Sequence, residues 1–169
     1  MQTPQEDVLD FHGDPMNSPP VYLLSLYRRF GFPFDHIYAF ESTKKDSQEV
    51  LDAIPEDVFA AYHWINVGVS SEMSSRNNPW NLVLNSYNGD DLIIVKLDVD
   101  TASVEVPLAH QLLNDTRLHR LVDHFYFEHH VRLSEISSAW GSSMQRSVQD
   151  SLDLFHGIRK KGVPSHFWV

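Results

Sequence analysis

The stretch from Asp91 to Val99 constrains the fold more than any other part of the chain. It contains Leu92-Ile93-Ile94-Val95, a continuous apolar run that is mostly β-branched. Such residues favour extended structure, and a strand that is apolar on both faces is typical of a parallel sheet covered by helices. The stretch therefore predicts a buried parallel strand in an α/β protein.

Other strand and helix signals alternate along the chain. Further strands are expected at His36–Phe40, His63–Val69, His124–Glu128 within Leu121–Val131, and His166–Val169; Val8–Phe11 is apolar but too short to assign alone. Helices are expected after Ser18, at Asp46–Ile54, Trp80–Tyr87 and Val106–Leu113, and from Ser147 to Gly162. The alternation predicts a doubly wound, mostly parallel sheet with helices on both faces.

Helix-end signals support several of these assignments. Ser18 can cap a first turn that contains Pro19 and Pro20, and Gly31 stands where a helix-terminating glycine belongs. Pro107 is tolerable only in the first turn of its helix. The last helix is expected to begin with a capping box of Ser147 and Asp150 and to bury Val148, Leu152, Phe155 and Ile158.

Composition predicts a soluble globular chain. Its 169 residues are 42% hydrophobic and contain no linker or repeat, so a single domain over residues 1–169 is expected. No run approaches the roughly 20 apolar residues of a membrane span, and the polar N-terminus lacks the pattern of a secretory signal. There is no cysteine, which excludes thiol chemistry, and the net charge of −10 argues against nucleic-acid binding.

In parallel α/β sheets ligands bind beyond the carboxyl ends of the strands, so residues at these positions are candidate site residues. Glu41 ends one predicted strand, where a carboxylate can accept hydrogen bonds from ribose hydroxyls; a helix cap or a solvated glutamate is the alternative. Gly13 precedes the first helix, where a ligand could approach the backbone closely. No G-x-G-x-x-G is present, so a simple turn also explains this glycine.

Acidic and histidine residues follow the two best-predicted strands. Asp98 and Asp100 point to the same side of an extended chain, and Glu128 is followed by His129 and His130. Such residues can bind a substrate, act as a general base or ligate a hard cation, although Asp100 could also cap the next helix. Their spacing matches no specific metal motif.

These segments resemble the FkbM-type S-adenosylmethionine-dependent methyltransferases. DDLIIVKLDVD, from Asp90 to Asp100, resembles the fourth-strand motif of that family, a K-x-D-x-E core followed by glycine and a further acid. HIYAFE, ending at Glu41, is similar to the ribose-binding strand, and WINVGVS, from Trp64 to Ser70, to the third strand. LVDHFYFEHHV and the C-terminal FHGIRKKGVPSHFWV resemble a branch with a glutamate–histidine motif and a histidine–tryptophan ending.

The resemblance implies a Rossmann-like methyltransferase fold with S-adenosylmethionine as cofactor. It places Glu41 at the ribose, Asp98 at the methionine end, Asp10 and Gly13 in the cofactor loop, and Gly68, Val69 and Ser70 near the adenine. Family members methylate hydroxyl groups of small molecules or sugars, so the expected partner is a small-molecule methyl acceptor. The general base is expected among Asp100, Glu128 and His129.

The chain also departs from the family pattern. Asp100 replaces the motif's glutamate, Thr101 the following glycine and Ser103 the further acid, and the first loop, DFHGDPMNSP, has a single glycine. Two alternatives to an active methyltransferase therefore stay open. One is an inactive methyltransferase-like binding or structural subunit with a protein partner. The other is a metal-dependent enzyme that uses the Asp/Glu/His cluster.

Overall fold

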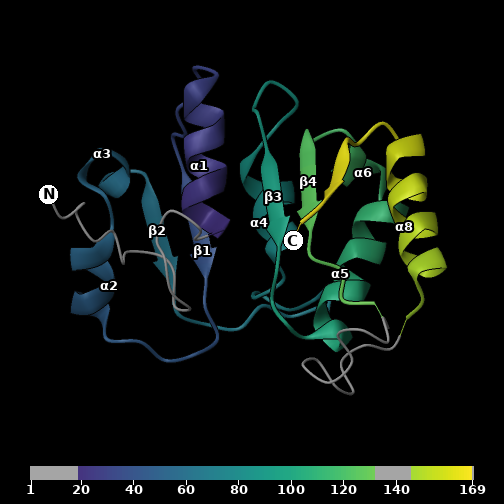
Figure 1. Cartoon of the computed structure of the whole chain (residues 1–169), viewed down its shortest axis with the longest axis horizontal. Helices are drawn as coiled ribbons and strands as arrows, with labels where there is room; N and C mark the ends of the chain where they lie inside the picture. Colours follow the sequence, from purple (N-terminus) through teal and green to yellow (C-terminus); the bar gives the residue numbers. More distant parts are fainter. Residues whose placement is uncertain (1–18, 132–145, 169) are drawn as a thin grey trace, which may run out of the picture. The chain divides into compact units, whose positions relative to one another are not determined.

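The computed structural model describes residues 19–131 and 146–168 and has a mixed α/β architecture with two small parallel sheets (Figure 1). The chain divides into two compact units between Gly68 and Val69. The expectation of a single domain stays a prediction. The apolar run Val8–Phe11 and the predicted cap Ser18 lie outside the described residues.

The first unit holds a parallel pair of strands. Its elements are α1 (Pro19–Arg29), β1 (Ile37–Phe40), α2 (Ser47–Ala53), α3 (Glu56–Phe59) and β2 (Tyr62–Ile65). The register pairs Ile37 with Tyr62 and Phe40 with Ile65. The strands β1 and β2 are connected through α2 and α3, as expected for a parallel connection, which needs a crossover.

Local signals account for the helix ends of this unit. Gly31 follows α1 with φ of +83°, a conformation that glycine adopts without a steric penalty. Asp46, expected as the first residue of the helix, is instead the cap of α2 and accepts hydrogen bonds from the amides of Gln48 and Glu49. The short helix α3 was not expected; it directly follows Pro55, which is its N-cap residue and makes no side-chain capping bond.

The second unit holds a three-stranded parallel sheet in the order β3-β4-β5. Its elements are α4 (Pro79–Ser86), β3 (Ile94–Leu97), α5 (Ala102–Asn114), α6 (Thr116–His119), β4 (His124–Phe127), α8 (Val148–Lys160) and β5 (Ser165–Phe167). β3 is shorter than the predicted strand Asp91–Val99, and β2 ends at Ile65 rather than at Val69. The capping box of Ser147 and Asp150 is present at the start of α8.

Aromatic side chains join the sheet of this unit to its helices. Phe125 and Phe127, on the same face of β4, are fully buried. The Phe125 ring lies 6.4 Å from that of Trp80 on α4, and the Phe127 ring 6.2 Å from that of Phe155 on α8. Figure 1 shows α5 and α8 side by side, and contacts between the two helices agree with this view. The core is therefore a layer between one face of the sheet and the helices.

Two expectations for the helices of this unit were wrong. α5 begins at Ala102, so Pro107 lies in the helix interior, where its lack of an N–H is tolerated within a long, well-packed helix. On α8, Val148 and Leu152 are 45% and 44% exposed, and the buried positions are Ser151, Leu154, Phe155 and Ile158. Phe155 and Ile158 are buried as predicted, whereas Ser151 and Leu154 take the buried positions that were expected for Val148 and Leu152.

Within the part of the chain that the structure describes, no helix is long and apolar enough to cross a membrane.

Candidate functional site

Carboxylates gather at the carboxyl ends of β3 and β4. Leu97 and Phe127 are register partners in these adjacent strands, so Asp98 and Glu128, the next residues, leave the sheet at the same edge and share a side-chain hydrogen bond. His130 Nε2 lies 3.3 Å from Glu128 Oε1 and 3.7 Å from Asp100 Oδ1. The structure thus brings together Asp98, Asp100 and Glu128, as their positions at strand ends predict.

Lys96 supplies the positive charge of this cluster. Its ammonium forms an ion pair with Asp98 and lies 5.2 Å from the centroid of the Trp168 ring. The Lys96 side chain is only 14% exposed, so the pair is shielded from bulk water. Lys96 belongs to the K-x-D motif but was not among the predicted site residues. A lysine inside an otherwise apolar strand is the sequence pattern that could have indicated a role.

Glu105 is a second residue that the sequence reasoning missed. It lies on α5, is 1% exposed, and accepts a hydrogen bond from the Val99 amide at 2.7 Å. Asp100, the next residue in that loop, has φ of +53°, which is uncommon for a residue with a side chain. Glu105 therefore fixes the loop that carries Asp98 and Asp100. An acid inside the apolar run SVEVPLA could have indicated a buried role.

Two carboxyl groups in and beside the cluster, those of Glu128 and Glu105, have raised pKa values. Burial, followed by the negative charge and the hydrogen bond of Asp98, raises the pKa of Glu128 to about 7, and the positive charge of Lys96 limits this shift. Burial also raises the pKa of Glu105, and the Val99 amide opposes that shift. A carboxyl group with a pKa near neutrality can both accept and release a proton under ordinary conditions. Chemically, the cluster can bind cationic or hydroxyl groups and accept a proton.

His129 faces away from this cluster. Its ring stacks on Phe127 at 4.9 Å, and its Nδ1 lies 3.0 Å from Ser151 Oγ on α8. Burial and then the charge of Arg146 lower the pKa of His129 to about 4, so its ring is neutral at pH 7. Because side chains alternate along an extended chain, His130 rather than His129 contacts Glu128. His129 instead lines a separate cavity of about 220 Å³.

Glu41 and Asn66 follow the strands of the first unit. The Thr43 amide donates to Glu41 Oε1 at 2.6 Å, and Asn66 Nδ2 donates to the carbonyls of Glu41 and Thr43 at 2.8 and 2.6 Å. The Lys45 amide in turn donates to Asn66 Oδ1 at 3.1 Å. These bonds hold the loop after β1 in place. Asn66 is a further residue that sequence reasoning missed.

Gly68, Val69 and Ser70 are the remaining described residues that were predicted to bind the cofactor. A Cβ at Gly68 would lie 3.3 Å from that of Ser42, so the backbone there is closely packed. Val69 packs against the core of the second unit. The Ser70 amide donates to the Asn77 carbonyl at 3.0 Å, and Ser70 Oγ accepts from the Glu72 amide at 3.2 Å. Asp10 and Gly13 lie outside the described residues.

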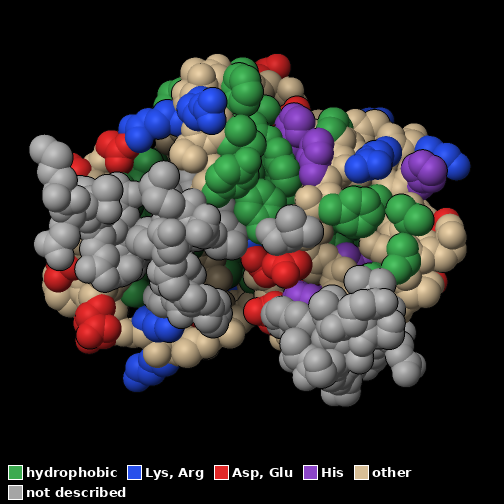
Figure 2. All heavy atoms as spheres, in the orientation of Figure 1, with side chains coloured by type: hydrophobic (Ala, Val, Ile, Leu, Met, Phe, Trp, Pro, Cys, Tyr) green, Lys and Arg blue, Asp and Glu red, His purple; other side chains and the backbone are tan. Residues whose placement is uncertain are grey.

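Acidic and histidine side chains also lie close together on the face drawn in Figure 2. Even so, residues 19–131 and 146–168 contain no group of three or more His, Asp or Glu side chains arranged to hold a metal ion. Lys96 lies within the carboxylate cluster, and an ammonium competes with a cation for the same oxygens. The Asp98 carboxylate is therefore paired with the Lys96 ammonium.

No family model matches the chain, and neither a curated protein nor a solved structure matches it.

Proposed function

We propose that this protein is an FkbM-like, S-adenosylmethionine-dependent methyltransferase that acts on a hydroxyl group of a small molecule or sugar. The observation that carries the proposal is the convergence of Asp98, Asp100 and Glu128 at the carboxyl ends of adjacent parallel strands. That edge is where parallel α/β sheets bind ligands. A Rossmann-like doubly wound sheet belongs to the proposal, and the parallel, helix-linked pairing within each unit supports it.

The residues at the strand ends are chemically suited to the cofactor. Glu41 directly follows β1, and a carboxylate has about four lone-pair sites, so the bond from Thr43 leaves capacity for ribose hydroxyls. Asp98 supplies the carboxylate that an α-amino group requires, and Gly68 would contact the adenine through its backbone on the side that is not packed against Ser42. When bound, S-adenosylmethionine supplies an electrophilic methyl group.

The protein's own contribution is to orient the acceptor hydroxyl and remove its proton. Glu128 is suited to this task because its pKa of about 7 lets the carboxylate form exist at neutral pH while keeping it basic. Lys96 forms an ion pair with Asp98, and the negative charge of Asp98 favours the proton on Glu128. After transfer, His130 is within reach to take the proton from Glu128.

Calorimetric titration of the full chain with S-adenosylmethionine and with its demethylated product tests the proposal. Binding is expected, and Glu41→Ala is expected to weaken it by about tenfold, the value of roughly one hydrogen bond to a charged group. Glu56→Ala, which removes an exposed acid of α3, is the matched control and should bind as the wild type does. Absence of heat at millimolar ligand would refute the proposal, and unchanged affinity in Glu41→Ala would refute the ribose assignment.

A binding or structural protein without catalytic activity is the second candidate. It is favoured by Glu41 Oε1 already accepting the Thr43 amide, and by Thr101 at the position where the family motif has glycine. This candidate predicts cofactor binding without methyl transfer to any hydroxyl acceptor. An active enzyme instead predicts turnover that Glu128→Gln reduces at least a hundredfold while leaving cofactor affinity unchanged.

A further inference from the structure

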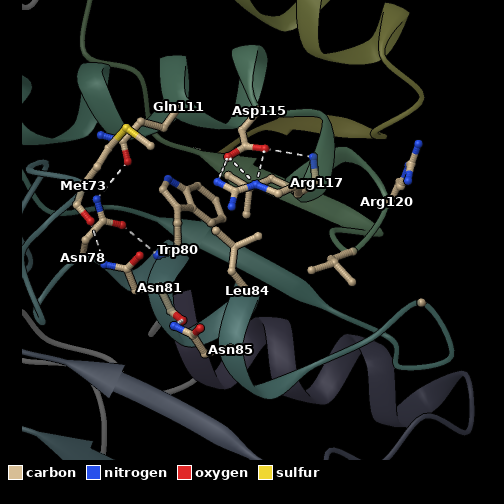
Figure 3. A pocket seen from close by; sticks show the side chains of 13 residues that line it. Met73, Asn78, Trp80, Asn81, Leu84, Asn85, Gln111, Asp115, Arg117 and Arg120 are labelled. Carbon is tan, nitrogen blue, oxygen red and sulfur yellow. Dashed lines mark hydrogen bonds and ion pairs between the residues drawn. The ribbon is translucent and has the colours of Figure 1, made fainter.

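A cavity of the second unit shares no residue with the carboxylate cluster. It has a volume of about 620 Å³, within the range of small-molecule sites, and it is lined by residues of α4, α5 and α6 and their loops. Figure 3 shows Asn81 and Asn85 of α4 on one side, the Asp115–Arg117 pair on the other, and Trp80 and Leu84 between them. None of the described residues predicted from the sequence as site residues lines it.

The asparagine wall is oriented by its own hydrogen bonds. Asn81 Nδ2 donates to the carbonyls of Met73 and Ser75, both at 2.9 Å, and Asn85 Nδ2 donates to the Asn81 carbonyl at 2.6 Å. Both N–H donors of Asn81 are engaged in these bonds, so its side-chain oxygen is the group that remains to contact a ligand, whereas Asn85 offers its side-chain oxygen and one further N–H. The two residues lie one helical turn apart, so their oxygens form a pair of hydrogen-bond acceptors on the same face of α4.

The opposite wall carries a closed ion pair. Arg117 Nε and Nη2 donate to the two carboxylate oxygens of Asp115 at 3.0 and 2.6 Å. The hydrogen bonds from Arg117 hold the pKa of Asp115 below its usual range, so the carboxylate stays ionised. The pair has no net charge, yet it presents both donor and acceptor groups to the cavity.

These walls restrict the kind of ligand. A cation would meet the guanidinium groups of Arg117 and Arg120. An anion would meet the Asp115 carboxylate and two amide oxygens, and it could reach the Arg117 guanidinium only by competing with Asp115, which leaves Arg120 at the rim as its cationic contact. A flat aromatic ligand lacks a stacking surface, because Trp80 is only 3% exposed. An uncharged molecule with several hydroxyl groups avoids each of these problems. Its hydroxyls can donate to the asparagine oxygens and accept from Arg117, while its C–H groups contact Leu84 and Leu121.

We propose that the cavity between α4 and α6 binds an uncharged polyol. The proposal does not depend on the methyltransferase function, because the cavity shares no residue with the carboxylate cluster. A ligand at this position would bridge α4 and α6, so it would also stabilise the second unit.

Saturation-transfer difference NMR on the full chain tests the site with myo-inositol, mannitol and glucose as probes. At least one probe is expected to give saturation transfer and a millimolar Kd. Asn85→Ala is expected to weaken that Kd about five- to tenfold, as the loss of one hydrogen bond predicts. Asn114→Ala removes an exposed asparagine outside the cavity and is expected to leave the Kd unchanged.

Other outcomes would overturn the proposal. Absence of transfer for all three probes would exclude a polyol site, and equal affinity in wild type and Asn85→Ala would place the site elsewhere. Glucose 6-phosphate is the matched anionic probe, and tighter binding of it than of glucose would contradict the assignment to uncharged ligands. Asn85 is exposed, so its replacement tests the site without disturbing the core.

Discussion

The strand ends of the two units use their polar side chains in different ways. After β1 and β2, Glu41 and Asn66 bond mainly to backbone groups of the adjoining loop. After β3 and β4, Asp98, Glu128 and His130 contact other charged side chains. Backbone partners fix a loop, whereas side-chain partners shift pKa values, and shifted pKa values mark functional positions. The raised pKa on which the proposed proton chemistry depends therefore belongs to the second unit, whereas Glu41 and Asn66 hold a loop of the first unit in place.

The two units also share a side-chain pattern. In the first, His36 Nδ1 lies 3.0 Å from His63 Nε2, and Tyr38 stacks on His63. In the second, His124 Nδ1 lies 3.2 Å from His166 Nε2, and Tyr126 stacks on His166. Each arises from a His-x-Tyr sequence paired with a histidine on the neighbouring parallel strand. We call these two groups of two histidines and a tyrosine the histidine ladders. Both sheets contain one, although the polar residues at their strand ends have different partners. Parallel strand pairing alone therefore does not decide the chemistry at the strand ends.

Packing gives the largest expected difference between the units. Phe127 is fully buried between sheet and helices, so Phe127→Ala should lower the free energy of unfolding by about 3–5 kcal/mol. Phe30, which is 72% exposed in the first unit, is the matched control, and Phe30→Ala should cost about 0.5 kcal/mol or less. Urea unfolding measures both. Equal losses would mean that the core of the second unit is not the main source of stability.

The carboxylate cluster predicts a pH effect specific to the second unit. The pKa of Glu128 is raised from 4.5 to about 7, so between these values the unfolded chain releases a proton that the folded chain keeps. Stability should fall as pH rises through that window by about 2 kcal/mol, less than the full pKa shift would give because solvent partly screens this half-buried carboxylate. Glu128→Gln should remove most of this fall, as measured by urea unfolding at a series of pH values.

Glu56→Gln, a replacement of an exposed glutamate in the first unit, is the control for that experiment. It should leave the wild-type pH dependence in place. A slope that survives in Glu128→Gln would show that Glu128 is not the group responsible.

The helix caps allow a smaller, matched comparison. Asn78 is 2% exposed, caps α4 through the Trp80 amide and donates to Gln111 Oε1 at 2.8 Å. Asn78→Ala should cost about 2 kcal/mol, because it removes a cap and leaves buried groups without a partner. Asp46→Ala, at the exposed cap of α2, should cost about 1 kcal/mol. Thermal or urea unfolding measures both losses of stability. A larger loss in Asp46→Ala than in Asn78→Ala would contradict the stabilising effect assigned to burial of the cap.

The histidine ladders give the smallest predicted effect. Burial lowers the pKa of His166, and the neighbouring His124 lowers it further. His124→Gln should therefore raise the pKa of His166 only partly toward its ordinary value, because the larger cause remains. NMR titration of the imidazole resonances measures this shift, with the exposed His156 as an internal reference. A complete return to the ordinary value would show that charge, not burial, is the dominant cause.

Local residue patterns were enough to predict most elements. The capping box at Ser147 and Asp150, the turn at Gly31 and the apolar β3 strand depend on interactions between near neighbours in the chain. The same reasoning placed Asp98 and Glu128 at strand ends, and their meeting followed from parallel pairing. Pro107 misled the prediction because a proline penalty, which is local, was outweighed by packing of the whole α5 helix.

The sequence by itself thus determined that strands and helices alternate and that acids follow the strands, since both depend on residue type and short-range order. Only the tertiary structure decided that His130 rather than His129 contacts Glu128, and that Lys96 and Glu105 complete the cluster. The direction of a side chain at a strand end depends on where the alternation of side chains between the two faces of the sheet stops. The burial of that side chain depends on which other elements pack against it. The pKa of Glu128 follows from that burial and from neighbours brought together across two strands.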